Sequence, residues 1–465
     1  MNWKRKSTAL LLVGSIAMLS ACGSGNDKDG GNASSGNGSK SSPSAASSSA
    51  SSTPAASEAA SGGKKIKLVF WNTSYPTIDE NDKTKKKEDF YIYKAIARYE
   101  AANPGVTIDI QDVPDGANAA TKFQTAGIAG NGPDVTNLWS GNYTMDLKSF
   151  IQPLNDYLTP SVVDSMTGWS AVTENFADTG TIYGVPDGSD GTIGILYNKM
   201  LFSAAGIDAE ANPPKTYDEF VDMLKKLKAS GVTPVGTDEQ GDFVYFLDYW
   251  LAQMVGTSGI NDIVNGNMNF NNDKLIEVMK GYRQLFADGY VTTDQHETQF
   301  YNGKVALIFG GNGSLNDARN ALGDDLGMFK IPNFSDAALV KDGGIGGTGA
   351  DFVVSKSSEH PEEAVKFILF LVSKEEQIER FKDGYRKLLN IKGVDASEFS
   401  DDPLVIEQQQ WANEASTIFW PDNIYPSELS DYIGSLNALL IKNQLDPADF
   451  LAKLDQKRDE INAQK

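Results

Sequence analysis

The chain has 465 residues, with 62 acidic against 41 basic side chains, a net charge of −21 and a single cysteine. A chain this acidic repels polyphosphates, and no Lys/Arg-rich motif offsets its charge. We therefore expect no nucleic-acid partner. One cysteine excludes an intramolecular disulfide framework, so a packed core must stabilise the fold.

The N-terminus has the pattern of a secretory signal. Lysine and arginine at positions 4–6 precede an apolar run from Ala9 to Leu19. This run is too short to span a bilayer, which takes about 20 apolar residues. The "LSAC" that ends at Cys22 resembles the lipobox of bacterial lipoproteins. The resemblance implies a signal peptide over 1–21, a lipid on Cys22 and anchoring to the outer face of the cell membrane. An ordinary signal peptide with an incidental cysteine is the alternative.

Residues 22–63 consist mainly of Ser, Gly, Ala and Asn and contain no aromatic side chain. Such a segment cannot bury enough apolar surface to fold. We expect it to be a disordered tether.

About 400 residues follow, too many for one ordinary core, which indicates two lobes. Alternating apolar residues predict a strand at 66–70, an amphipathic pattern predicts a helix at 89–105, and a second alternation predicts a strand at 106–113. A further strand is expected at 192–198.

The clearest helix signal is the capping box formed by Thr216 and Glu219, with Gly231 at the helix end. Later segments predict strands at 304–311 and 349–356 and a helix over 361–384. Strands that alternate with helices in this way indicate an α/β fold with largely parallel sheets.

Catalytic and metal-binding signatures are scarce. The two histidines, His296 and His360, fit no zinc motif, and no nucleophile elbow or phosphate loop occurs in a strand-to-helix setting. We therefore expect no enzyme activity, no metal and no cofactor. A glycoside hydrolase stays open as the alternative, because it needs only two of the 62 carboxylates.

Aromatic side chains stand beside short polar ones in "NLWSGNY", "DFVYFLDYW" and "FWPDNIYP". A sugar presents apolar C–H faces and a rim of hydroxyls, so flat aromatic rings beside Asp and Asn suit it. For any one of these rings, core packing is the competing interpretation. The second stretch in particular also fits a buried helix.

Several segments together resemble the bacterial extracellular solute-binding proteins of ABC importers, the family that includes maltose- and other oligosaccharide-binding proteins. They are "KLVFWN", "RYEAANPGVTIDI", "AGNGPDVTNLW", "GTIYGVPDGSDGTIGILYNKMLFSAAGI" with "PPKTYDEFVDMLKKLK", "YNGKVALIFGG", "KIPNF" and "SSEHPEEAVKFILFLVSKEEQ". The resemblance covers essentially 64–465. Peptide and other non-sugar solutes stay open as ligands.

The resemblance implies a two-lobed, type II periplasmic-binding-protein-like fold that binds solute in an interlobe cleft and closes about a hinge. It implies a monomer with a mono- or oligosaccharide ligand and ABC permease subunits as partners. The chain would pass between lobes at 186–191, near 331–336 and near 388–394. Lobe 1 would then comprise 64–187 plus about 333–390, and lobe 2 would comprise 188–332 plus about 391–465.

Residues that match the family's binding positions are the implied ligand contacts. Family members often carry a tryptophan where this chain has "GGNGSLND", which disfavours tight maltodextrin binding and leaves room for a different or decorated glycan. The implied contacts are Trp71, Asn72, Trp139, Ser140, Asn142, Asp187, Asp190, Tyr245, Phe246, Asn312, Trp420 and Tyr425.

Overall fold

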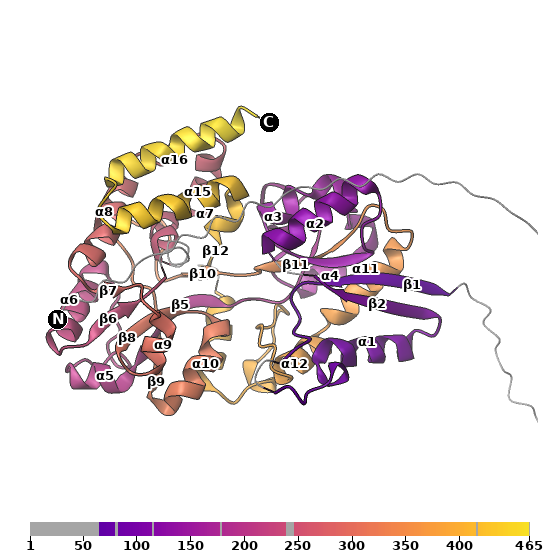
Figure 1. Cartoon of the computed structure of the whole chain (residues 1–465), viewed down its shortest axis with the longest axis horizontal. Coiled ribbons are helices and arrows are strands. Elements are labelled where there is room, and N and C mark those ends of the chain that lie inside the picture. Colours follow the sequence, from indigo (N-terminus) through magenta and orange to yellow (C-terminus); the bar gives the residue numbers. More distant parts are fainter. Residues whose placement is uncertain are drawn as a thin grey trace, which may run out of the picture. The chain divides into compact units, whose positions relative to one another are not determined.

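The computed structural model describes residues 65–79, 82–113, 116–176, 179–238, 246–414 and 417–464, without the side chains of residues 116, 117, 175 and 312. All of these residues belong to one compact unit, Gly62–Lys465. Within it, the described strands form two sheets (Figure 1).

The first sheet has the strand order β2-β1-β3-β11-β4. Its centre is parallel, because β1 pairs with β2 from Ile66 opposite Val106 to Asn72 opposite Asp112, and also pairs with β3. β11 is antiparallel to β3 and to β4. The bounds are β1 Ile66–Asn72, β2 Val106–Asp112, β3 Val135–Trp139, β4 Val185–Pro186 and β11 Ala350–Val354.

Helices cover both faces of the first sheet. Leu68 and Phe70 of β1 pack with α1 (Tyr91–Ala102) and α11 (Pro361–Leu371). Trp71 points to the opposite face, where α2 (Gly116–Ala129) packs. In Figure 1, α1 and α2 accordingly lie on opposite sides of these strands. We call these elements lobe 1.

The second sheet has the order β12-β10-β5-β8-β6-β7, with β9 also paired to β5. β5 is its axis, antiparallel to β8, β9 and β10. The bounds are β5 Thr192–Asn198, β6 Thr233–Gly236, β7 Val291–Thr292, β8 Val305–Gly310, β9 Leu326–Lys330, β10 Gly344–Gly346 and β12 Thr417–Phe419.

Two groups of helices enclose the second sheet, and we call this assembly lobe 2. One face carries the larger cluster of buried apolar side chains, contributed by α6, α7, α8, α15 and α16. The other face packs against α9, α10 and α13. The bounds are α6 Tyr217–Ala229, α7 Asp248–Val264, α8 Asp273–Ala287, α9 His296–Tyr301, α10 Asn312–Leu322, α13 Pro403–Ala412, α15 Ser427–Ile441 and α16 Pro447–Asn462.

Shorter helices connect the larger elements. The α-helical ones are α3 Asn142–Met145, α4 Pro160–Ser165, α5 Lys199–Ala204, α12 Lys374–Lys382 and α14 Pro421–Ile424. Single 3₁₀ turns are η1 Lys87–Asp89, η2 Lys148–Phe150, η3 Asn155–Tyr157, η4 Trp169–Val172, η5 Glu174–Phe176, η7 Gly323–Asp325 and η8 Ala396–Glu398.

The chain passes between the two sheets at three places. The first passage, 187–191, joins β4 to β5, and the second, 347–349, joins β10 to β11. The third, 384–390, follows α12, and its Leu388 exchanges backbone hydrogen bonds with Ser189 of the first passage. The second passage comes later than the expected 331–336, because β10 pairs with β5 and β12 of the second sheet.

The elements expected from periodicity are present within a few residues of their expected ends, with one exception. The single helix expected over 361–384 is two helices, α11 and α12. Ser373 separates them, because its side chain accepts a hydrogen bond from the Glu376 amide and so caps a new helix.

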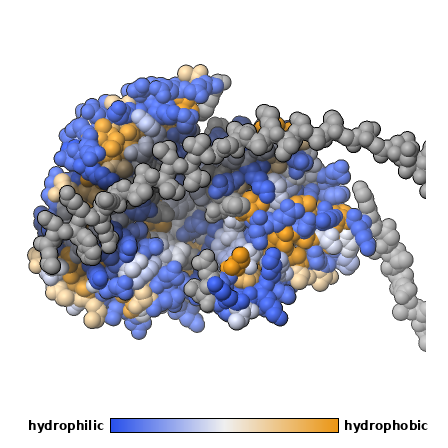
Figure 2. Space-filling model, viewed as in Figure 1, coloured by the Kyte–Doolittle hydropathy of each residue, from blue (hydrophilic) through white to orange (hydrophobic). Residues whose placement is uncertain are grey.

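Hydrophilic residues cover most of the face that Figure 2 shows, as the net charge of −21 leads one to expect. Apolar residues form separate patches in that view.

The capping box of α6 gives a first testable prediction. The Thr216 hydroxyl accepts from the Glu219 amide at 3.3 Å, and the Glu219 carboxylate accepts from the Thr216 amide at 3.3 Å. Thr216→Ala should therefore lower the free energy of unfolding by about 1 kcal/mol. Urea denaturation measures this change. Thr216→Ser keeps the hydroxyl and is the matched control; equal losses in both variants would contradict the capping role.

Candidate functional site

A cavity of about 520 Å³ lies where the first and third passages meet the helices of lobe 2. Its wall contains Asp190 of the first passage and Trp420, which precedes α14. Both were predicted ligand contacts. The remaining wall residues are Ile193, Gly311, Gly313, Ser314, Asn316, Asp317, Gly384, Tyr385, Arg386 and Lys387.

The second passage comes close to the same place. A Cβ added to Gly349 would lie 1.9 Å from Asp190 Oδ2 and 3.8 Å from Trp420 Nε1. The Asp190 amide donates to the Gly347 carbonyl at 2.9 Å. A side chain at position 349 would therefore displace the Asp190 carboxylate from its place near the indole.

Residues just after β3 form hydrogen bonds to α14. The Ser140 hydroxyl donates to the Thr348 carbonyl at 2.6 Å and accepts from Asn423 Nδ2 at 3.3 Å. Asn142 Nδ2 donates to the carbonyl oxygen of Ile424. The polar groups of these two predicted contacts thus hold lobe 1 against α14.

Trp139, the last residue of β3, has a different environment. Its side chain is 44% exposed, and its ring meets Tyr143 edge-on with centroids 5.0 Å apart. An exposed indole fixed by a second ring is a suitable platform for a ligand with apolar faces.

Asp187 is fully buried in an ion pair. Its Oδ1 lies 2.5 Å from Arg380 Nη1, and both side chains are inaccessible to solvent. Tyr75 donates its hydroxyl to the same carboxylate oxygen at 3.2 Å. Burial alone would lower the pKa of Arg380, but the Asp187 carboxylate and the neighbouring tyrosine hydroxyls together outweigh that effect, so the pKa is raised and Arg380 stays charged. The structure therefore gives Asp187 a structural role at the first passage.

Lys387 lies between the two aspartates of the first passage. Its Nζ is 3.6 Å from Asp190 Oδ1 and 3.8 Å from Asp187 Oδ2, and it donates to the Asp187 carbonyl at 3.2 Å. Burial would lower the pKa of Lys387, but Asp190, Tyr385 and Asp187 together raise it above the ordinary value. Lys387 is thus a charged member of the cavity wall.

Sequence reasoning missed the segment 385–387, which brings Tyr385, Arg386 and Lys387 to the cavity. A signal was available, because "GYRK" combines an aromatic ring with two cations just before the expected third passage.

Trp71 and Asn72 have contacts within lobe 1. The Trp71 ring is 8% exposed and lies beneath the Lys122 ammonium, 4.1 Å from the ring centroid. The Asn72 amide bonds to the backbone of Tyr75 and to the Asp112 carboxylate, and so shapes the turn after β1.

Phe246 and Tyr425 pack in the core of lobe 2. Phe246 is 2% exposed, with ring centroids 4.1 Å from Trp250 and 4.4 Å from Phe309. Tyr425 is fully buried and donates to Asp248 Oδ1 at 3.4 Å, and burial raises the pKa of both groups. This packing matches the buried-helix alternative for the stretch containing Phe246.

The structure does not describe the side chains of three predicted site residues. Tyr245 and the lipidation site Cys22 lie outside the described residues, and the side chain of Asn312, at the start of α10, is also not described.

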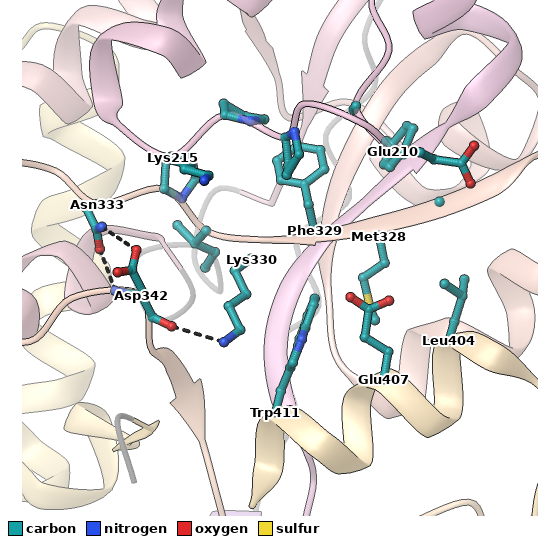
Figure 3. A pocket seen from close by; sticks show the side chains of 17 residues that line it. Glu210, Lys215, Met328, Phe329, Lys330, Asn333, Asp342, Leu404, Glu407 and Trp411 are labelled. Atoms are coloured by element: carbon teal, nitrogen blue, oxygen red, sulfur yellow. Dashed lines mark hydrogen bonds between the residues drawn. The ribbon is translucent and has the colours of Figure 1, made fainter. Parts of the chain in front are cut away.

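Another cavity, of about 590 Å³, lies along β9 between α13 and the residues 209–215 (Figure 3). Two of its charged residues are hydrogen-bonded within the chain: Lys330 donates to the Asp342 carbonyl at 3.0 Å, and Asn333 donates to the Asp342 carboxylate at 2.9 Å. Among the described residues, none of the predicted ligand contacts lines it. We therefore take the cavity at the passages as the candidate site.

Within the described ranges, no three His, Cys, Asp or Glu side chains lie together in a way that could hold a metal ion. Nor does any helix in the described part of the chain have the length and apolar character needed to cross a membrane.

Two sheet-centred lobes, three passages and a cavity beside those passages are the features of a hinged binding protein. The family of bacterial extracellular solute-binding proteins matches residues 84–378, and the chain belongs to this family.

Relatives and solved structures agree with this membership. The sn-glycerol-3-phosphate-binding periplasmic protein UgpB of Shigella flexneri is 26% identical over 306 residues, which cover 62% of this chain and 68% of the relative. UgpB of Escherichia coli K12 matches to the same extent.

Among solved structures, a chitin oligosaccharide binding protein is 24% identical, with a TM-score of 0.71 over 86% of this chain and 100% of that one. The ABC substrate-binding protein Lmo0181 from Listeria monocytogenes, in complex with cycloalternan, is 18% identical, with a TM-score of 0.65 over 86% and 100%. The expected α/β, two-lobed periplasmic-binding-protein-like fold is confirmed.

The buried ion pair gives the prediction for this site. Asp187→Asn leaves the Arg380 charge buried without its partner, so the free energy of unfolding should fall by about 3–5 kcal/mol. Asp190→Asn is the matched control, because Asp190 is 35% exposed and its removal should cost less than about 1 kcal/mol. Chemical denaturation of both variants measures the difference. A stable Asp187→Asn protein that has lost only ligand binding would show instead that Asp187 is a ligand contact.

Proposed function

We propose that the protein is the solute receptor of an ABC import system and binds a mono- or oligosaccharide in the cavity at the passages. Ligand that touches both lobes shifts an open–closed equilibrium toward the closed form, which then docks on the permease. The receptor acts as a monomer and performs no chemistry itself.

The observation that carries this proposal is that Asp190 and Trp420, which is 7% exposed, both line the cavity wall. A carboxylate accepts hydrogen bonds from sugar hydroxyls, while an indole packs on the C–H face of a sugar ring. The exposed Trp139 offers a further platform on lobe 1. We propose that Ser140 and Asn142, which follow Trp139 along the chain, lie next to the ligand.

Similar proteins support a sugar and also suggest a second candidate. Two structural neighbours are described with a chitin oligosaccharide and with cycloalternan. The UgpB relatives are named for sn-glycerol-3-phosphate. Arg386 and Lys387 in the cavity wall favour this candidate, because cations bind phosphate.

Calorimetry of the purified protein with a panel of glycans and with sn-glycerol-3-phosphate tests the ligand class. We expect a glycan to bind with a micromolar dissociation constant, about −8 kcal/mol, within reach of two or three aromatic contacts and a few charge-assisted hydrogen bonds. If sn-glycerol-3-phosphate binds and no glycan does, the ligand is the second candidate and not a sugar. Turnover of a chromogenic glycoside would instead establish the glycoside hydrolase alternative.

Trp139→Ala should weaken glycan binding by about 10- to 30-fold, because it removes an exposed aromatic platform. Its free energy of unfolding should change by less than about 1 kcal/mol, since the side chain is 44% exposed. Ile128→Ala, at an apolar side chain 73% exposed on α2, is the control and should leave affinity unchanged. A large loss of stability in Trp139→Ala would identify Trp139 as a core residue.

We further propose that Cys22 carries a lipid that anchors the protein to the outer face of the cell membrane. Two acyl chains bind a membrane stably, whereas one binds it only marginally. Cys22→Ala should therefore release the protein into the medium or leave unprocessed precursor, which fractionation and immunoblotting detect. Unchanged membrane retention of the variant would refute the anchor.

A further inference from the structure

The third passage contributes one side chain, Lys387, that reaches both aspartates of the first passage. The two ion-pair distances, 3.6 Å to Asp190 and 3.8 Å to Asp187, are nearly equal. The Lys387 side chain is only 12% exposed, so its ammonium group is held between these carboxylates. A single cation therefore bridges the first passage from its buried end to its cavity end.

The buried end of this bridge is fixed. Asp187 is tied to Arg380 of α12, which packs on α1 and α11 of lobe 1, and to Tyr75, which follows β1. Space around the pair is small, because a Cβ on Gly188 would lie 2.4 Å from Arg380 Nη2. Asp187 consequently cannot follow Lys387 if the third passage moves.

The cavity end is open. Asp190 is 35% exposed and lines the cavity beside Trp420. A ligand over Asp190 would exclude water from its carboxylate. The interaction between Lys387 and Asp190 then becomes stronger, because an ion pair strengthens as water leaves. Without Lys387, the buried Asp190 charge would be costly.

We propose that Lys387 is a positioning residue: it holds the Asp190 carboxylate toward the cavity and couples ligand binding there to the alignment of the first and third passages. The inference rests on the proposed function, in that the ligand is taken to bind at Asp190. Because coupling between two sites is reciprocal, a ligand that strengthens the Asp190 pair also orders the passages.

Ligand affinity in a double-mutant cycle tests the coupling. Lys387→Met and Asp190→Asn should each weaken binding of the glycan found by calorimetry by about 10-fold, and the double variant should be no weaker than Asp190→Asn alone. Lys387→Arg keeps the charge and should restore most of the affinity. Lys392→Met changes an exposed lysine just beyond the third passage and is the control. If the affinity loss in the double variant equals the product of the losses in the two single variants, the two residues act independently and the proposal is wrong.

Hydrogen exchange in the unliganded protein tests the same bridge without any ligand. Ser189 and Leu388 exchange backbone hydrogen bonds of 2.8 and 2.9 Å across the two passages. Lys387→Met should raise the exchange rate of these two amides by about 10-fold, while Lys392→Met should not. Unchanged exchange in Lys387→Met would refute the bridge even if a glycan binds. If Lys387→Met exchanges faster but no glycan binds in calorimetry, the bridge is supported and only the sugar assignment is wrong.

Discussion

The hinge region depends on the buried ion pair between Asp187 and Arg380. Two charges removed from water each carry a large desolvation penalty, so neither is tolerated without the other. Arg380 belongs to α12, which packs on α1, and Asp187 follows β4 of the first sheet. The pair therefore fixes the beginning of the first passage to lobe 1. Any rotation of lobe 2 has to take place beyond Asp187, where Gly188 and Gly191 have φ values of 73° and 82° that suit glycine.

Two polar contacts join the lobes beyond β3, and the rings of Phe176 and Phe419 also meet across the lobes, with centroids 6.3 Å apart. Asn423 bonds to Ser140, and Asn142 bonds to the backbone of α14. A typical hydrogen bond contributes about 0.5–1.5 kcal/mol net, so these two together are small beside the roughly −8 kcal/mol of a micromolar ligand. The contacts of such a ligand would therefore outweigh these two hydrogen bonds.

Much of the fold could be predicted from local signals, and much less of the site. The strand at 192–198 and the capping box of α6 follow from periodicity and cap chemistry, and the structure has both. The break at Ser373 was less visible, because its cap lies inside a continuous amphipathic pattern. Trp71 follows the alternation of β1 into the space under α2, which the sequence alone does not reveal, because two covered faces both read as apolar.

The pair of aspartates in "VPDGSDG" shows why residue type alone does not identify a ligand contact. Asp187 and Asp190 are three positions apart, yet one is fully buried and the other is 35% exposed in the cavity wall. The turn at Gly188, with its positive φ, sends the two carboxylates into different surroundings. Only the packing of α12 and the third passage decides which aspartate meets the buried Arg380 and which lines the cavity.

The same packing bears on the choice between a sugar and a phosphate. Arg386 and Lys387 are cations of the cavity wall, and Asp190 and Asp317 are its carboxylates. Lys387 already lies between Asp190 and Asp187, so its charge is largely balanced before any ligand enters. A phosphate would have to compete with these carboxylates and would be repelled by them, whereas a neutral polyhydroxyl ligand can accept from the cations and donate to the carboxylates. The balance of charge around the cavity thus favours the sugar.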